Sequence, residues 1–386
     1  MAATQSLTLK NIANHFDRLP DPRCDINLRH PLDSVVVISV MGILAGCHGP
    51  TTIAQWARLK KEFLCANLDL PHGVPGKDVF RTVLSRLDPR LFQECFSNWL
   101  ESLRLKAMEK LKIDQPLYNI DGKTNRRSHD RAKGLGALHS VTFWASELGL
   151  SLGQVACAEK SNEITAIPEL LQLVDIEGSI ITIDAMGTQK EIAKQIIDGK
   201  ADFVLALKGN QDNLHDEVME HIDQQFATDF ADGVERSHTV TEKLHGKMET
   251  REYKQFPVPK DLPMLKDWPG LKTIGIVIRH YLKNGESCSD TRYYISSLEM
   301  GVKNFARAVR GHWGIENGCH WTLDMTFRED ESRIRDKNGR ENFAWLNRLG
   351  LSLLKQHPAK ASIIMKRRMC GWSDEFLLQV LTGIEA

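Results

Sequence analysis

The sequence predicts an α/β protein in which a mixed sheet is flanked by helices, with a helical region before it and a β-rich insertion within it. Apolar residues recur at intervals of three and four through residues 10 to 110, which indicates helices. From about residue 116, short β-type segments alternate with amphipathic ones. Residues 212 to 300 are rich in β-type residues, and helical patterning returns after residue 302. A meander followed by strand–helix–strand units argues for helices packed against a mixed sheet.

Composition and charge exclude several classes of protein. The 386 residues are 42% hydrophobic and 26% charged, ordinary values for a globular chain of two or three domains. No run of about 18 apolar residues occurs, so no membrane span is expected. The eight cysteines include no Cys-x-x-Cys pair, which favours reduced thiols in a cytoplasmic protein. The net charge is zero, but basic clusters at 123–133 and 355–368 are candidates for neutralising phosphates or for a solvated face.

Residues 1 to 112 are expected to form a small helical domain. The longest apolar stretch, "SVVVISVMGILAGC", follows a proline and is expected to be a buried helix. Helix periodicity alone does not separate a DNA-binding domain from one that only packs, and packing is the favoured interpretation.

Residues 113 to 386 are expected to hold the mixed sheet. Thr188 is a candidate N-cap and Gly199 a candidate helix stop. Asn284-Gly285 is a strong hairpin-turn signal within the insertion. The expected strands span 116–121, 137–146, 151–160, 179–184 and 202–208, and the expected helices span 163–174 and 188–199.

Two of these strands end in the same way. Asp121 follows Ile120 in "YNIDGKT", and Asp184 follows Ile183 in "ITIDAMG". If the strands are neighbours, both carboxylates reach the crevice at the strand ends, where open α/β sheets bind ligands. Either aspartate alone is explained as a turn or helix cap. The matched contexts of the two aspartates favour a shared site.

Carboxylates that meet in this way need a partner. Two of them about 4 Å apart repel by roughly 4 kcal/mol at an effective dielectric constant near 20. A shared proton or a divalent cation relieves this repulsion, and oxygen ligands select hard ions such as Mg²⁺ or Mn²⁺.

A third acid is expected in "GHWGIENGCHWTLDMTFREDESR". A polar stripe, spaced by four along one helix face, comprises His312, Glu316, His320 and Asp324. Glu316 lies in the middle of the stripe, and the rival acids are Asp324, Glu329 and Asp330. The alternative is a solvated polar face. Trp313 and Trp321 are interpreted as core residues rather than as platforms for an extruded base.

Other chemistry-bearing motifs fit less well. "GKT" at 122–124 lacks the glycine of a phosphate-binding loop, because Leu117 stands in its place. Asp121 lacks the acid two residues later that a phosphatase-type nucleophile needs, because that residue is Lys123. The chain has no His-Glu-x-x-His zinc motif and no Gly-x-Ser-x-Gly nucleophile elbow.

Several ordered motifs together resemble bacterial insertion-sequence DDE transposases, in particular the subgroup of H-repeat-associated proteins. The motifs are "NIDGKT", "KSNEITAIPELL", "TIDAMGTQ", "LALKGNQ", "TRYYISSL" and "HWGIENGCHWTLDMTFRED". "FDRLPDPRCDINLRHPL" resembles the accessory N-terminal domain of that subgroup, so the likeness covers about residues 10 to 385. It implies an RNase H-like catalytic domain with the β-rich insertion placed before a catalytic glutamate.

The resemblance implies a catalytic and metal-binding triad of Asp121, Asp184 and Glu316. These residues would hold two Mg²⁺ or Mn²⁺ ions for phosphoryl transfer. The implied partners are double-stranded DNA, as element terminal repeats and target, and a second copy of the chain in a dimer or larger assembly. The implied location is the bacterial cytoplasm, on the nucleoid when DNA is bound. The candidate DNA contacts are Lys123, Arg126, Lys208, His312 and His320.

The implied function is metal-dependent DNA strand cleavage and strand transfer at insertion-sequence ends. Related transposases carry a tyrosine, an arginine and a lysine around the glutamate, where this chain has Val309, His312 and Leu323. A catalytically impaired DNA-binding relic or regulator is therefore the alternative hypothesis. A nuclease without strand-joining activity is a third.

Overall fold

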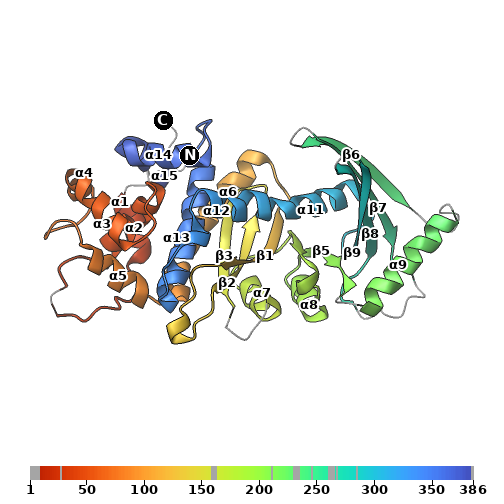
Figure 1. Ribbon diagram of the computed structural model, residues 1–386, viewed down its shortest axis with the longest axis horizontal. Helices are drawn as coiled ribbons and strands as arrows, with labels where there is room; N and C mark the ends of the chain where they lie inside the picture. The colour runs from red at the N-terminus through yellow and green to blue at the C-terminus, as the bar shows by residue number, and fades with distance from the viewer. Residues whose placement is uncertain are drawn as a thin grey trace, which may run out of the picture.

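The computed structural model describes residues 9–383 except 27, 158–162, 210–211, 229–234, 245–246, 260–265, 267 and 284–285. A nine-stranded mixed sheet runs through the molecule in the order β3-β2-β1-β4-β5-β9-β8-β7-β6, with helices packed against it (Figure 1). The predicted α/β class with a large mixed sheet is confirmed.

The first half of the sheet is RNase H-like. The first three strands form an antiparallel meander, and the next two run parallel to β1. A helix connects β3 to β4 and another connects β4 to β5, and all seven segments match the predicted types. The strands are β1 (Leu117–Asn125), β2 (Leu138–Ala145), β3 (Leu150–Ala156), β4 (Ile180–Ile183) and β5 (Asp202–Leu207), and the helices are α7 (Glu163–Leu171) and α8 (Lys190–Asp198).

The β-rich segment continues the same sheet. The prediction of β structure from residue 212 was wrong for its first part, which is helix α9 (Asp212–Ala227). Four antiparallel strands follow, and the last of them pairs with β5 through Val204 and Ser296. They are β6 (Arg236–Leu244), β7 (Lys247–Pro257), β8 (Thr273–Lys283) and β9 (Glu286–Ser296). The predicted turn at 284–285 lies outside the described residues, but Lys283 pairs with Glu286 on either side of it.

Helices from both ends of the chain share one apolar core. The buried stretch predicted from the sequence is α2, whose residues Val35 to Leu44 are all buried because the helix is apolar on every side. The helices are α1 (Leu9–Ala13), α2 (Leu32–Leu44), α3 (Pro50–Leu59), α4 (Lys61–Asn67), α5 (Lys77–Arg86) and α6 (Pro89–Leu111), with α13 (Lys337–Gln356), α14 (Ile363–Trp372) and α15 (Asp374–Thr382) from the other end. This arrangement favours the packing interpretation, and the boundary at residue 112 stays a prediction.

Part of the basic cluster at 355–368 serves this packing. Lys366 donates hydrogen bonds to the carbonyls of Leu354 and His357, and Arg367 donates to the carbonyl of Ile43. Both cations are buried, so neither belongs to a phosphate-binding patch or to a solvated face. Each of the eight cysteines is free. Among the helices in the described ranges, none combines the length and apolarity that a membrane crossing requires.

Candidate active site

The parallel pairing of β1 with β4 brings the two predicted aspartates together. Ile120 pairs with Ile183, so Asp121 and Asp184 follow at neighbouring positions on adjacent strands. β4 ends there, while β1 continues to Asn125 and, within the described part of the chain, pairs only with β2. The open edge of β1 borders a cavity of about 610 Å³ that is lined by Asp121, Asp184 and Glu316.

Asp184 has a local reason to stand where it does. Its Oδ1 accepts hydrogen bonds from the backbone amides of Met186 at 3.0 Å and Gly187 at 3.4 Å, and it thereby caps a short 3₁₀ turn. The capping interpretation is therefore correct, and it is compatible with the shared site, which stays a prediction. Gly187 is needed for packing, because an added Cβ would collide with Ile183.

Glu316 comes from a continuous helix that crosses the sheet beside β1 (Figure 1). The helix comprises α11 (Val302–Ile315), a π-helical turn (Glu316–His320) and α12 (Trp321–Met325). In an α-helix every fourth residue drifts by about 40° around the axis. A π turn has i→i+5 hydrogen bonds and more residues per turn, so it offsets that drift. The turn therefore keeps the polar stripe directed toward one strand.

The stripe meets the polar side of β1 residue by residue. His312 Nδ1 lies 2.9 Å from Thr182 Oγ1, which accepts a hydrogen bond from Asn119. His320 Nδ1 lies 3.5 Å from Asp121 Oδ2, and Lys123 donates to Asp324. The alternative of a solvated face is thus wrong for most of the stripe, although the Glu316 side chain is 52% exposed.

The donor atoms suit a divalent cation. One ligand atom each from Asp121, Glu316 and His320 lie within 4.8 Å of one another. His320 is buried, and its Nε2 has no hydrogen-bond partner among the residues described. Two carboxylates and an imidazole are ligands that Mg²⁺ and Mn²⁺ sites use, the oxygens being the better match.

The two carboxyl groups titrate in opposite directions. Burial, followed by the charge of Glu316, raises the pKa of Asp121 above its usual range. The imidazole of His320, whose Nδ1 lies 3.8 Å from Glu316 Oε2, holds the pKa of Glu316 below its usual range. Without a cation, these opposite shifts favour the proton on Asp121 rather than on Glu316, and bound positive charge would replace that proton.

Two predicted DNA contacts line the same cavity. Lys208 is exposed at its rim, and His312 forms part of its wall. Burial lowers the pKa of His312 to about 4. The imidazole is therefore neutral at physiological pH, and the candidate DNA contact of His312 stays a prediction.

Two more predicted contacts, Lys123 and His320, face inward. The Lys123 side chain is 6% exposed, and its Nζ lies 2.6 Å from Asp324, 3.6 Å from Asp330 and 3.9 Å from Glu329. Glu329 also forms a buried ion pair with Arg348 at 3.1 Å. The rival acids therefore surround cations in a buried network beside the site.

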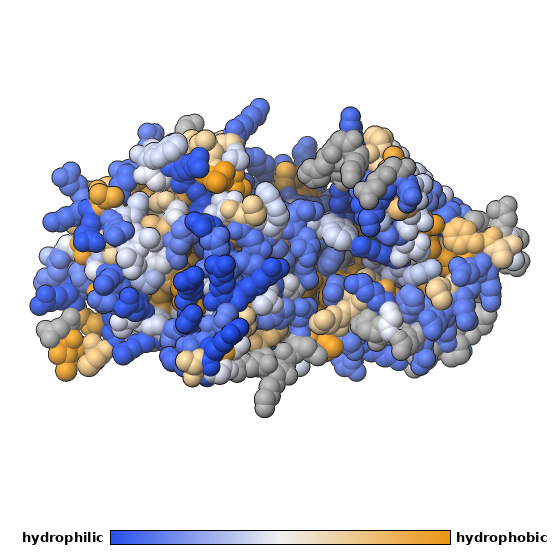
Figure 2. Space-filling view, in the orientation of Figure 1, coloured by the Kyte–Doolittle hydropathy of each residue, from blue (hydrophilic) through white to orange (hydrophobic). Residues whose placement is uncertain are grey.

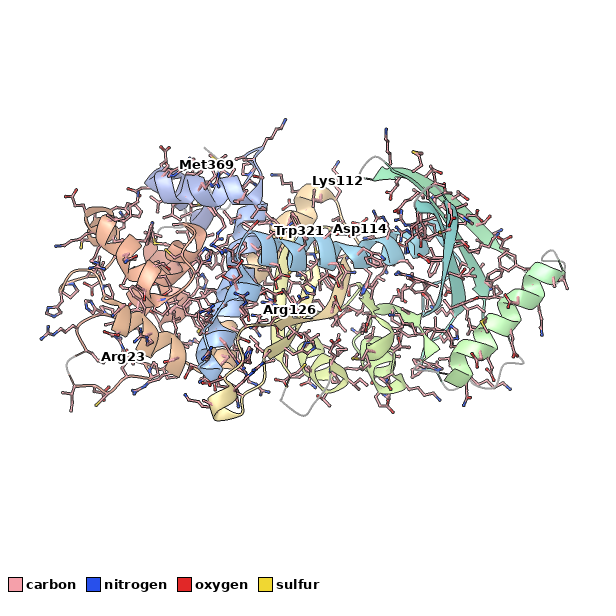
Figure 3. All side chains as sticks on the ribbon, viewed as in Figure 1. Arg23, Lys112, Asp114, Arg126, Trp321 and Met369 are labelled. Carbon is pink, nitrogen blue, oxygen red and sulfur yellow. The ribbon has the colours of Figure 1, made fainter. Side chains whose placement is uncertain are left out.

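Arg126 is the predicted contact that solvent reaches most freely. Its side chain is 82% exposed, and its Nε lies 3.3 Å from Asp330. Arg126 lies beneath the crossing helix that carries Trp321 in Figure 3. Hydrophilic residues cover the middle of this face in Figure 2.

The sequence interpretation missed a second cavity, of about 770 Å³, that adjoins the first. It lies between the strands β7 to β9 and the crossing helix, and the two cavities share Arg292 and Trp313. Its arginines are Arg251, Arg279, Arg292 and Arg310. Trp313 is 39% exposed and Trp321 60% exposed, so the prediction that both are core residues is wrong. Strand alternation places Arg251, Arg279 and Arg292 on one face of the sheet, and that pattern was the available signal. Arg310 comes from α11.

An RNase H-like sheet with paired aspartates and a helix-borne glutamate defines a class of metal-dependent enzymes that act on nucleic-acid phosphates. Residues 109–353 match the family described as transposase DDE domain, and residues 13–100 match the family described as DDE_Tnp_1-associated. The chain belongs to the DDE transposase family.

The curated relatives place it in the H-repeat-associated subgroup. It is 33% identical over 384 residues to the "H repeat-associated putative transposase YhhI" of Escherichia coli K12, covering 98% of this chain and 99% of that protein. It is 34% identical over 382 residues to the "Putative transposase YncI" of Escherichia coli O157:H7, covering 98% and 96%. A solved piggyBac transposase synaptic complex with hairpin DNA is 12% identical to this chain and has a TM-score of 0.39. The match covers 97% of this chain and 78% of that one.

Proposed function

We propose that this protein cleaves DNA strands at the ends of an insertion sequence and joins them to a target. Asp121, Asp184 and Glu316 are its catalytic carboxylates. The observation that carries this proposal is their convergence: three acids spread over nearly 200 residues of sequence line one cavity at the open edge of β1. Family membership indicates that the substrate is DNA. Asp121, mostly buried beside other acids, is stabilised in its charged form only when positive charge is bound nearby.

Each residue has a task that follows from its surroundings. Divalent cations, when bound, activate the attacking hydroxyl and stabilise the leaving oxygen. Asp121 is central because it adjoins both Asp184 and Glu316. Asp184 is held rigid by its backbone hydrogen bonds, which leave Oδ2 for a ligand. His320 fixes the orientation of Asp121 and Glu316.

DNA is bound by the exposed cations around the cavity. Lys208 and Arg292 line it, and Arg126 stands at the solvent side of β1. The neutral His312 instead fixes Thr182. Synapsis of two element ends requires a dimer or larger assembly on the DNA, which light scattering of the complex measures.

Substitution of Asp184 tests the assignment. Asp184→Asn keeps the size and the capping oxygen but removes the charge, so cleavage of an end-labelled duplex in Mn²⁺ is expected to fall at least about a hundredfold. Asp198→Asn is the matched control, because Asp198 is 62% exposed in an ion pair on α8 and should leave cleavage unchanged. Full cleavage by Asp184→Asn would remove Asp184 from the triad.

The second candidate is a DNA-binding relic or regulator. It is favoured by the neutral His312 and by the buried Leu323, which occupy the positions where related transposases carry cations. DNA binding without cleavage in Mn²⁺, by a chain that binds Mn²⁺, would support it. Strand-transfer products from a pre-cut end would exclude both this candidate and a nuclease that cannot join strands.

A further inference from the structure

A histidine–glutamate pair lies beside the site on the other side of β1. Glu163 begins α7, and its Oε1 lies 2.9 Å from His139 Nε2 on β2. His139 Nδ1 in turn lies 2.8 Å from Thr124 Oγ1. Both ring nitrogens are thus engaged, which fixes the ring and with it the carboxylate. The Glu163 side chain is 13% exposed.

Gly122 brings this carboxylate to the strand edge. An added Cβ on Gly122 would collide with Glu163 Oε1 and would lie 2.9 Å from His139 Nε2. The carboxylate therefore rests on the backbone of the residue that follows Asp121. Since β4 ends at Ile183, this part of the strand edge is open, and acids stand on both sides of it.

Glu163 adds a carboxylate beside a site that already holds three others. Its Oε1 rests on Gly122, the residue after Asp121, and Asp121, Asp184 and Glu316 line the adjoining cavity. A fourth carboxylate there is unfavourable unless positive charge is bound nearby. The N-terminus of α7 stabilises the negative charge of Glu163 only slightly. That stabilisation does not explain why Glu163 is paired with a histidine on β2.

We propose that Glu163, oriented by His139, is a fourth carboxylate ligand of the metal centre, next to Asp121 across Gly122. Four carboxylates balance the charge of two divalent cations, whereas the three of the triad leave an excess positive charge. His139 is a positioning residue. The inference rests on the proposed function, because it requires that the triad binds metal.

Binding of Mn²⁺ alone to the purified full chain tests this without reference to activity. Free Mn²⁺ is counted by electron paramagnetic resonance, and melting is followed with and without Mn²⁺. Glu163→Gln is expected to weaken Mn²⁺ binding at one site by about tenfold or more, with little change in metal-free melting. Glu169→Gln, on the same helix and paired with Arg90 at the surface, is the matched control and should bind as wild type.

Each outcome separates this inference from the proposed function. Unchanged Mn²⁺ number and affinity in Glu163→Gln, with or without a lower metal-free melting temperature, would overturn the fourth ligand. If Asp121→Asn loses Mn²⁺ binding in the same series, the triad stands; if it does not, the metal centre itself fails. Should Glu163→Gln not fold, His139→Gln decides: a loss of about tenfold supports the proposal, and wild-type affinity overturns it.

Discussion

Individual carboxyl groups in this protein differ according to what surrounds them. Asp184 is stabilised by backbone amides, Asp121 is buried among acids, and Glu316 is held by His320. Away from the site, burial raises the pKa of Glu341 on α13 to about 7. Burial therefore raises the pKa both of Asp121, a proposed functional acid at the sheet edge, and of Glu341, which is only packed in a helix.

Glu341 gives a stability prediction with a defined sign. The native state binds its proton up to a pH of about 7, whereas the unfolded chain releases it near 4.5. Stability contributed by this group is therefore present below pH 4.5 and lost as the pH rises toward 7. Glu341→Gln is expected to raise the free energy of unfolding by about 1–3 kcal/mol at pH 8 and by much less at pH 4.5. Urea denaturation at both pH values measures this, and an equal effect at both would contradict it.

The element that matters most is the helix that crosses β1. Its π turn keeps His320 and Asp324 opposite Asp121 and Lys123 of β1. His312 contacts Thr182 on the neighbouring strand β4. Where the helix ends, Lys123 of β1 lies in a buried network with three acids, Asp324, Asp330 and Glu329. Removing one partner from such a network leaves uncompensated buried charge.

Substitution of Lys123 tests whether the network holds the helix to the strand. Lys123→Met is expected to lower the free energy of unfolding by about 3–5 kcal/mol, because Asp324 loses its cation and Glu329 keeps only Arg348. Lys194→Met, at a 63% exposed ion pair on α8, should change it by less than about 0.5 kcal/mol. A Lys123→Met protein as stable as the control in urea denaturation would refute the structural role of Lys123.

At the scale of the whole molecule, the first helices and the last belong together. Leu349 and Leu354 of α13 lie in the same apolar core as Val36 and Ile38 of α2. The two family matches, 13–100 and 109–353, divide the sequence at a place where the core is continuous. The N-terminal region therefore stabilises the catalytic half, whatever else it binds.

Truncation tests this dependence. A chain of residues 113–386 would expose the apolar surface of α13 that α2 and α5 now cover. It is expected to aggregate or to lose its cooperative thermal transition, while the full chain melts as one unit. A monodisperse, folded fragment in size-exclusion chromatography and circular dichroism would contradict this expectation.

Asp184 was predictable as a residue that follows a strand, because strand ends obey local patterns. The predicted strand end at Asp121 was wrong, since β1 continues to Asn125, but the parallel pairing of β1 with β4 still aligns the two aspartates. The burial of Lys123 and the exposure of Trp321 were not, since both depend on which face of a helix or strand the rest of the fold covers. The π turn leaves no periodic signal over five residues. Glu163 was not predicted as a site residue, because its proposed role depends on a contact between distant parts of the sequence. Its carboxylate fits against β1 only because residue 122 is a glycine.

The central claim is that the carboxylate cluster cuts and joins DNA with the help of a divalent cation. Its most direct measurement is incubation of the full chain with labelled DNA that carries the flanking element ends, with and without Mn²⁺. The account predicts nicked and strand-transferred products that require Mn²⁺ and disappear in Asp121→Asn. DNA that is bound but remains uncut in Mn²⁺, by a chain that binds the ion, would contradict it.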